Sequence, residues 1–196
     1  MLDPHDFDDI LVSIMDVAEK VGRVGEGAKL VASLQSRTDA VRNMKIKSRP
    51  RVLCIEWLDP LFTAGHWVPQ MVEYAGGING ISTAGEPSRR MQIDEAVQFD
   101  PDVIVLMPCG FEIPRILKEL LPLAGDKTWK SLRAVRNNNL YAVNANAYFS
   151  KPGPRTVAGL EILAKILHPE ASRRIKTPKG AFKKVRFHDT GFHLDN

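Results

Sequence analysis

The segment RVLCIEW at residues 51–57 sets the fold class of this chain. It places four apolar residues in a row, Val52 to Ile55, after a basic connector that ends at Pro50. Uninterrupted apolar runs of this kind are typical of parallel strands that helices cover on both faces. The segment therefore predicts a buried strand within a sheet that helices cover on both faces.

The chain that follows alternates between helical and strand patterns. Two more buried strands are predicted at 102–107 and 140–143, and helical spacing of apolar residues is found at 68–75, 93–99, 113–121, 129–135 and 156–167. Strands that alternate with helices predict an α/β unit with a mostly parallel sheet flanked by helices, a Rossmann-like lobe. We assign this lobe to residues 50–169.

The two flanking regions have a different character. Residues 1–48 are predicted to be helical: Asp3 and Pro4 open a first helix, and a long, modestly apolar helix over about 24–43 lies on the lobe as a strut. Residues 170–196 show little periodicity and are predicted to be an irregular, basic extension.

The charge of the chain is unevenly distributed. The 196 residues carry a net charge of +4, but residues 171–188 hold seven Lys/Arg and no acid. Removing these seven charges from +4 leaves about −3 for the rest. Because the basic character is local, the lobe is not predicted to bind nucleic acid.

The sequence contains no recognisable targeting segment. No apolar run approaches the ~20 residues that span a bilayer. The N-terminus is acidic from Asp3 onward and lacks the basic and apolar regions of a secretion signal. We expect a soluble chain, cytoplasmic or organellar, or a processed or partial version of a longer protein.

Common catalytic and metal motifs are missing from the sequence. Cys54 and Cys109 are predicted to be buried free thiols on neighbouring strands, with a disulfide between them left open. No Cys/His spacing indicates a zinc site. The glycines match neither a dinucleotide loop nor a phosphate loop, and no Gly-x-Ser-x-Gly elbow occurs.

Aromatic side chains follow all three predicted strands. In an open α/β sheet, ligands gather at the carboxyl ends of the strands. The residues there form what we call the aromatic ledge: Trp57, Trp67, Phe111, Tyr148 and Phe149. Such a surface suits a large, flat, partly apolar ligand. Each member also has a plainer interpretation: Trp57 or Phe111 as core, and Trp67 as packing at a helix start.

Two polar residues beside the ledge leave alternatives open. His66 is more simply a hydrogen-bonding loop residue than an axial ligand to a metal-bearing group. Cys109 paired with His66 would make a nucleophile and its base, which is the weaker, enzymatic hypothesis.

Three segments together resemble a known family. They are RVLCIEWLDPLFTAGHWVPQMVEYAGG (51–77), FDPDVIVLMPCGF (99–111) and NNLYAVNANAYFSKPGPRTVAGLEILAKILHP (138–169). The chain resembles the cobalamin-binding-like branch of the class III periplasmic substrate-binding proteins, the iron-siderophore and vitamin B12 type. The resemblance implies two lobes bridged by one long helix. Here residues 24–43 would be that helix and 50–169 the C-terminal lobe, with the N-terminal lobe absent.

The resemblance also implies a function and a site. It implies a non-enzymatic substrate-binding protein for a corrinoid, such as cobalamin, or a similar large metal chelate, with no permanently bound cofactor and no resident metal. An ABC permease would be its partner, docked through Asp94 or the neighbouring Glu95, and complete bacterial relatives would be periplasmic. The implied ligand-binding residues are Trp57, Gly65, His66, Trp67, Cys109, Gly110, Phe111, Tyr148 and Phe149.

Two expectations follow from the missing lobe. The chain would be a truncated form whose open cleft face favours self-association, because a second copy can supply the second wall. The alternative is an interaction or scaffold module that uses the aromatic ledge and the basic tail to bind an acidic partner.

Overall fold

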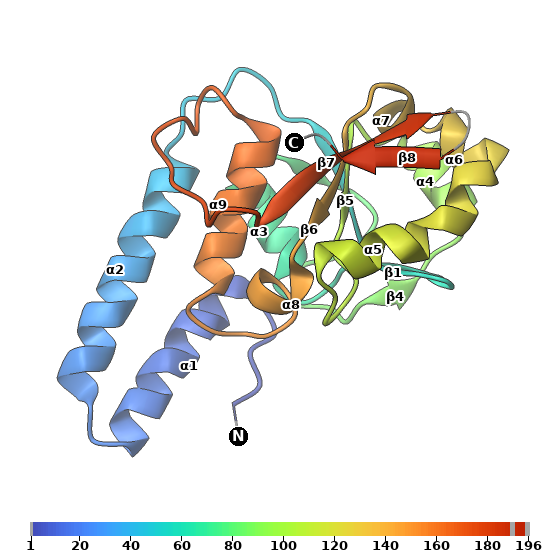
Figure 1. Ribbon diagram of the computed structural model, residues 1–196. Coiled ribbons are helices and arrows are strands. Elements are labelled where there is room, and N and C mark those ends of the chain that lie inside the picture. The colour runs from blue at the N-terminus through green and yellow to red at the C-terminus, as the bar shows by residue number, and fades with distance from the viewer. Residues whose placement is uncertain (1, 189–190, 195–196) are drawn as a thin grey trace.

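The computed structural model describes residues 2–188 and 191–194 as a lobe of alternating strands and helices with a two-helix hairpin beside it (Figure 1). The longer helices are α1 (Phe7–Lys20), α2 (Val24–Arg42), α3 (Val68–Tyr74), α4 (Ile93–Phe99), α5 (Ile113–Leu120) and α9 (Thr156–Leu167). The shorter ones are η1 (Leu121–Gly125), α6 (Lys127–Ser131), α7 (Arg133–Arg136) and α8 (Ala145–Tyr148). The strands are β1 (Arg51–Leu58), β2 (Leu61–Thr63), β3 (Ile78–Asn79), β4 (Arg89–Arg90), β5 (Val103–Leu106), β6 (Leu140–Val143), β7 (Phe182–His188) and β8 (Gly191–Leu194).

All strands join one sheet, in the order β4-β2-β1-β5-β6-β7-β8, with β3 paired to β1. The centre is parallel, because β3 and β5 flank β1 in parallel and β6 follows β5 in parallel. The strands toward the two edges, β2, β4, β7 and β8, pair antiparallel. The prediction of a mostly parallel sheet flanked by helices is confirmed.

Helices cover both faces of the central strands, as the unbroken apolar runs predicted. Alternate residues of β1 point to opposite sides: Val52 and Cys54 pack with α1, α2, α3 and α9. Leu53 and Ile55 pack with the side that holds α4, α5, α6 and α7. The result is two buried apolar layers with the sheet between them.

The hairpin of α1 and α2 is attached to the lobe through few buried residues. The helix α2 buries only Gly27, Leu34, Thr38 and Val41, which agrees with its description as a strut. Arg37 on α2 forms a two-pronged ion pair with Glu161 on α9, at 2.9 and 2.6 Å, and the Glu161 side chain is only 9% exposed. No helix among the described residues is long and apolar enough to cross a bilayer.

The prediction of an irregular C-terminal extension is wrong. The extension 170–196 is not irregular, because Phe182–His188 pairs antiparallel with β6 and Gly191–Leu194 pairs with β7. Residues 189–190 and 195–196 of that extension lie outside the described residues. A free β6 edge offers unpaired backbone groups, and pairing satisfies them whatever the charge of the added strand.

A short hairpin lies between Trp57 and Trp67. Strand β1 continues to Leu58, the chain turns at a cis Asp59–Pro60 bond, and β2 returns alongside β1. The predicted helix at 129–135 is two short helices, α6 and α7.

Candidate functional site

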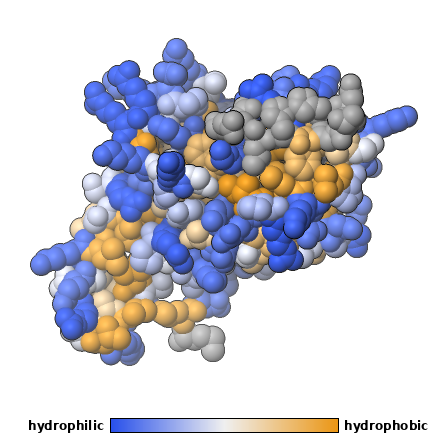
Figure 2. Space-filling view, viewed as in Figure 1, coloured by the Kyte–Doolittle hydropathy of each residue, from blue (hydrophilic) through white to orange (hydrophobic). Residues whose placement is uncertain are grey.

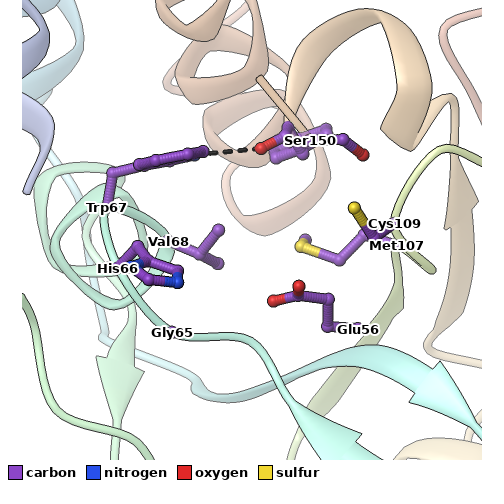
Figure 3. Close-up of a pocket in the computed structure, with 9 residues that line it drawn as sticks. Glu56, Gly65, His66, Trp67, Val68, Met107, Cys109 and Ser150 are labelled. Atoms are coloured by element: carbon purple, nitrogen blue, oxygen red, sulfur yellow. Dashed lines mark hydrogen bonds between the residues drawn. The ribbon is translucent and has the colours of Figure 1, made fainter. Parts of the chain in front are cut away.

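A pocket opens at the carboxyl ends of the parallel strands, where the sequence places a binding site. Its lining comes from β1, from the loops after β2 and β5, and from the end of α8: Glu56, Gly65, His66, Trp67, Val68, Met107, Cys109, Phe149 and Ser150. Figure 3 shows Glu56 pointing into the space between His66 on one side and Met107 on the other. The cavity measures about 180 Å³.

The turn at Gly65 and His66 packs against residues 86–88, which hold it in place. A Cβ atom on Gly65 would lie 2.3 Å from the Ser88 nitrogen and 2.5 Å from the Glu86 carbonyl oxygen. The sequence therefore needs glycine here to let two backbones meet. The His66 N–H donates to the Glu86 carbonyl at 2.6 Å, and Gly85 donates back to the His66 carbonyl.

His66 has a left-handed backbone, with φ of 52°. This region is uncommon for a residue with a side chain, and such residues gather at functional sites. Its ring lies 5.6 Å from the Trp67 ring, centroid to centroid. The turn thus presents the imidazole at the pocket wall.

Trp67 connects the first pocket loop to the third. Its indole N–H donates to the Phe149 carbonyl at 3.0 Å, as the dashed line in Figure 3 shows. Ser150 makes the corresponding link to the second loop, because its hydroxyl accepts from the Gly110 N–H at 2.8 Å and donates to the Ala145 carbonyl. Gly110 has φ of 76°, which explains the glycine. All three loops are therefore fixed to one another.

Glu56 is the one carboxylate in the pocket lining, which contains no Lys or Arg. Its Oε2 accepts from the Ser88 hydroxyl at 2.5 Å, and that hydroxyl oxygen accepts the Gly65 N–H. The side chain is held in place while the carboxylate still lines the cavity. The pocket consequently has one negative charge, at Glu56, beside the polar side chains of His66 and Ser150 and an otherwise apolar or thiol-bearing wall.

Glu56 also borders a second, apolar groove. This groove is lined by Glu56, Trp57, Pro60, Phe62 and Ser88 and measures about 530 Å³. Trp57 is 38% exposed there, with its ring 5.2 Å from that of Phe111. The Arg115 guanidinium covers Phe111 at 3.6 Å from the ring centroid. Pocket and groove meet at Glu56, so one ligand can contact both.

The two cysteines differ, contrary to the prediction that both are buried. Cys54 lies in the core, and burial raises the pKa of its thiol to about 12. Cys109 is exposed and lines the pocket, and both thiols are free. No group of three His, Cys, Asp or Glu suited to a metal ion occurs in the described part of the chain.

The structure brings together most, but not all, of the residues selected from the sequence. Gly65, His66, Trp67, Cys109 and Phe149 line the pocket. Trp57 borders the adjoining groove, and Gly110 supports the pocket through Ser150. Phe111 is 5% exposed beneath Trp57, and Tyr148 packs against the apolar core, so neither lines the pocket.

Sequence reasoning missed Glu56, Val68, Met107 and Ser150 in the lining. Glu56 carried a usable signal, because a charged residue near the end of an apolar strand run implies a partly exposed position. Ser150 carried none, since its hydrogen bond joins residues 40 positions apart.

The two acids considered for docking lie at the start of α4. Glu95 is engaged twice: its carboxylate pairs with Arg89 at 2.7 Å and accepts the Gln92 N–H. The bond from Arg89, and after it that from Gln92, lowers the pKa of Glu95. Asp94 is exposed, and no ion pair found among the described residues involves it.

The chain is similar to proteins of known structure. One is a substrate-binding protein of an ABC transporter from Listeria monocytogenes, 22% identical, with a TM-score of 0.75 over 87% of this chain and 67% of that one. Another belongs to an ABC-type Fe³⁺-hydroxamate transport system of Saccharomonospora viridis, 24% identical, with a TM-score of 0.69 over 85% of this chain and 57% of that one. A third is IsdE of Staphylococcus aureus complexed with heme, 19% identical, with a TM-score of 0.74 over 86% of this chain and 67% of that one.

These likenesses support the lobe architecture, and the chain spans about 57–67% of the length of these three structures. No curated protein matches the sequence. The model of the family described as periplasmic binding protein matches residues 1–147, which include α1, α2, the pocket turn and most of the sheet. The chain therefore belongs to the periplasmic binding protein family.

Proposed function

We propose that this lobe is a non-enzymatic, ligand-binding part of a substrate-binding protein that serves an ABC importer. One observation carries the proposal: the loops after β2 and β5 are both hydrogen-bonded to the segment that ends α8, and together they form a rigid rim around one pocket. Family membership supports the same assignment. Rigid positioning favours binding, because little ordering is needed when the ligand arrives.

The cavity is too small to enclose a typical ligand, so we infer a ligand that extends beyond it. Sites for drug-sized ligands usually measure about 300–1,000 Å³, whereas this cavity holds about 180 Å³. The adjoining groove, whose lining includes Trp57 and Phe62, adds a volume of about 530 Å³ with mostly apolar walls. We infer that a bulky, partly flat ligand inserts one edge beside Glu56 and rests its face on Trp57.

The charge of the lining narrows the ligand class. Glu56 faces the cavity, and neither the pocket nor the groove contains Lys or Arg. A carboxylate-bearing ligand would meet like charge there, whereas amide or hydroxyl donors would find an acceptor. We therefore propose a neutral or cationic metal chelate: a corrinoid with amide side chains first, a ferric hydroxamate second, and heme with its two carboxylates last.

His66 is suited to contact the metal of such a chelate. In the described chain, neither ring nitrogen of His66 forms a hydrogen bond, and the ring lies at the pocket wall. Neutral imidazole is a common ligand for cobalt and iron. This role stays a proposal beside the plainer one, in which His66 only shapes the turn.

The partner surface follows from the two acids on α4. Because Glu95 is already paired with Arg89, Asp94 is the better candidate to bind a basic permease. The exposed groove beside Trp57 also favours a second function, as an interaction surface that includes self-association of two lobes across their pockets.

Titration of the protein with three chelates tests the binding proposal. Tryptophan fluorescence would be followed on adding aquocobalamin, a ferric hydroxamate or hemin. We expect quenching with the first or second, and loss of at least half of it in Trp57→Phe. Trp129→Phe is the matched control, because Trp129 is fully buried and its indole nitrogen has no hydrogen-bond partner to lose.

The variant Glu56→Gln tests whether the charge of Glu56 selects among the chelates, separately from whether the pocket binds a chelate at all. Removing the carboxylate should improve hemin binding about tenfold, since a like-charge contact of order 1 kcal/mol is relieved. It should leave the neutral hydroxamate within about twofold. If none of the three chelates quenches the fluorescence of the wild-type protein, the ligand-binding proposal is wrong. The groove beside Trp57 would then be explained by the second function, an interaction surface.

A further inference from the structure

A band of positive charge lies at the end of the lobe opposite the pocket. Two segments contribute to it: the connector 44–50 between α2 and β1, and the turn 171–177 after α9. Neither contains an acidic residue. Six exposed cationic side chains make up what we call the cationic face: Lys45, Lys47, Arg49, Arg173, Arg174 and Lys176.

The two segments lie side by side although more than a hundred residues separate them. Met44 lines one cavity together with Arg174, Ile175 and Lys176. Ile46 and His168 both approach the Cα of Gly76, and Arg49 donates to the Gly77 carbonyl at 2.7 Å. Figure 2 shows a largely hydrophilic surface at the upper left, where Figure 1 places these segments.

The charges of this face are not neutralised within the described chain. None of the six side chains takes part in an ion pair among residues 2–188 and 191–194, whereas Arg37, Arg89 and Arg133 each pair with an acid. The acids nearest in sequence are Asp39, Glu56 and Glu170, and none of them forms an ion pair with these cations in the described chain. Without these six cations, the net charge of +4 becomes about −2. This face therefore carries six positive charges without an ion pair among the described residues, more than the net charge of +4 of the whole chain.

We propose that the cationic face binds the anionic headgroups of a phospholipid membrane as a peripheral contact. Clustered Lys and Arg are attracted to the negative potential of anionic lipids, and the contributions of the side chains add. An aliphatic side chain is also present, because Ile78 is 41% exposed and its N–H bonds to the Pro50 carbonyl beside Arg49. Cations around an exposed aliphatic residue suit the lipid interface.

A lipid surface fits this face better than a nucleic acid does. Single-stranded nucleic acids are usually held by exposed aromatic side chains on which bases stack. The aromatic residues closest in sequence to the turn, Phe182 and its neighbour Tyr141, are partly buried and pack on each other at 6.5 Å. Nothing aromatic is thus offered to a base.

The placement of the face leaves the pocket free. The connector 44–50 precedes β1, and the turn 171–177 follows α9, so both lie at the amino ends of the parallel strands. The pocket and Asp94 lie toward the carboxyl ends. A lobe bound to lipid through the cationic face would turn its pocket and Asp94 away from the bilayer. Lipid contact and docking on a permease through Asp94 would therefore be alternative states of the lobe, and ligand could enter the pocket in the lipid-bound state.

Vesicle sedimentation with matched charge variants tests the proposal. Wild type should bind vesicles of phosphatidylcholine with phosphatidylglycerol but not pure phosphatidylcholine, and raising the salt to about 1 M should release it because screening then acts within ~3 Å. The triple variant Lys47→Glu/Arg174→Glu/Lys176→Glu should bind ~100-fold more weakly. The control Lys29→Glu/Lys118→Glu/Lys127→Glu changes the net charge equally at other exposed lysines, and it should bind as wild type does.

Several results would overturn this inference. One is equal loss of binding in the two triple variants, which would mean that net charge alone matters. Another is displacement of the protein from vesicles by single-stranded RNA or inorganic phosphate at matched phosphate concentration. If the triple Glu variant unfolds by circular dichroism, the triple Gln variant at the same positions replaces it. The same variants would also be titrated with the chelates. Because the substituted residues lie outside the pocket, chelate binding should be unchanged, so the lipid proposal can fail without the ligand-binding proposal failing.

Discussion

The indole nitrogen of Trp67 lies 3.0 Å from the carbonyl oxygen of Phe149, 82 residues further along the chain. This bond closes the pocket rim between the loop after β2 and the end of α8. It also explains why a tryptophan stands at a loop position: the ring fills the wall while its N–H donates to a backbone carbonyl of another segment.

Replacing Trp67 by Phe should remove that bond and keep an aromatic ring. We expect the free energy of unfolding to fall by about 1 kcal/mol, the usual net value of one hydrogen bond, measured by urea denaturation. Trp57→Phe is the matched control. Its N–H donates only to Asp59 within the same exposed turn, so a change below about 0.5 kcal/mol is expected. Equal losses in both variants would contradict the structural role of Trp67.

Gly65→Ala should be far more harmful than an alanine at another glycine. The new Cβ would lie 2.3–2.5 Å from backbone atoms of residues 86–88, which cannot move as a side chain can. We expect a loss on the order of 2–3 kcal/mol together with loss of chelate binding. Gly25→Ala on α2 meets no atom within 4 Å and should stabilise the protein by about 0.5–1 kcal/mol. Thermal and urea unfolding of both variants would decide.

The two thiols should react at different rates. Cys109 is exposed at the pocket, whereas Cys54 is buried with its pKa raised to about 12. Because the thiolate is the reacting species, iodoacetamide at pH 8 should label Cys109 in the native protein and both residues after unfolding. Mass spectrometry gives the site. A chelate bound in the pocket should slow the labelling of Cys109, and fast native labelling of Cys54 would contradict the buried strand.

Burial of Cys54 should also make stability depend on pH. Its folded pKa is raised, so the stabilising effect is complete below the ordinary thiol pKa near 9 and is lost as pH rises toward about 12. In that window the free energy of unfolding should fall by up to about 1.4 kcal/mol per pH unit from this group. The fall should be smaller in Cys54→Ala. Burial also raises the pKa of Tyr74 to about 12, and this partly exposed group adds a smaller fall above its ordinary pKa of 10 in both proteins.

The ion pair between Arg37 and Glu161 should matter more than a surface pair on the same helix. Arg37→Met leaves a mostly buried carboxylate without its partner, and we expect a loss of about 2 kcal/mol, because Arg37 itself is partly exposed. The control is Arg23→Met, which breaks a fully exposed pair with Glu26 and should leave the free energy of unfolding nearly unchanged. Similar values for the two would mean that α2 is not held through this contact.

Much of the lobe could be predicted because its elements are encoded locally. The helix over Thr156–Leu167 and the strand over Leu140–Val143 have the predicted bounds, since each has its own apolar periodicity and a clear start or stop signal. The strand β7 was missed for the opposite reason. Its cations hide the alternation, and only the free edge of β6, distant in sequence, makes it a strand.

The candidate site also has a part that the sequence predicted and a part that it could not predict. Sequence placed aromatic and glycine residues at the ends of three strands, and Gly65, His66, Trp67, Cys109 and Phe149 do meet at one pocket. It could not tell that Phe111 would be covered by Arg115, or that Glu56 would be held toward the cavity by Ser88. Those outcomes depend on contacts across 4 and 32 residues whose geometry no local pattern specifies.

The amino-acid sequence by itself determined the layered α/β lobe and the edge of the sheet at which the pocket lies, because burial and periodicity act along short stretches of chain. Only the tertiary structure decided which aromatic rings stay open, which carboxylate lines the pocket, and that two distant basic segments form one face. Side-chain exposure and charge proximity are properties of packed neighbours, and they exist only once the strands and helices have come together.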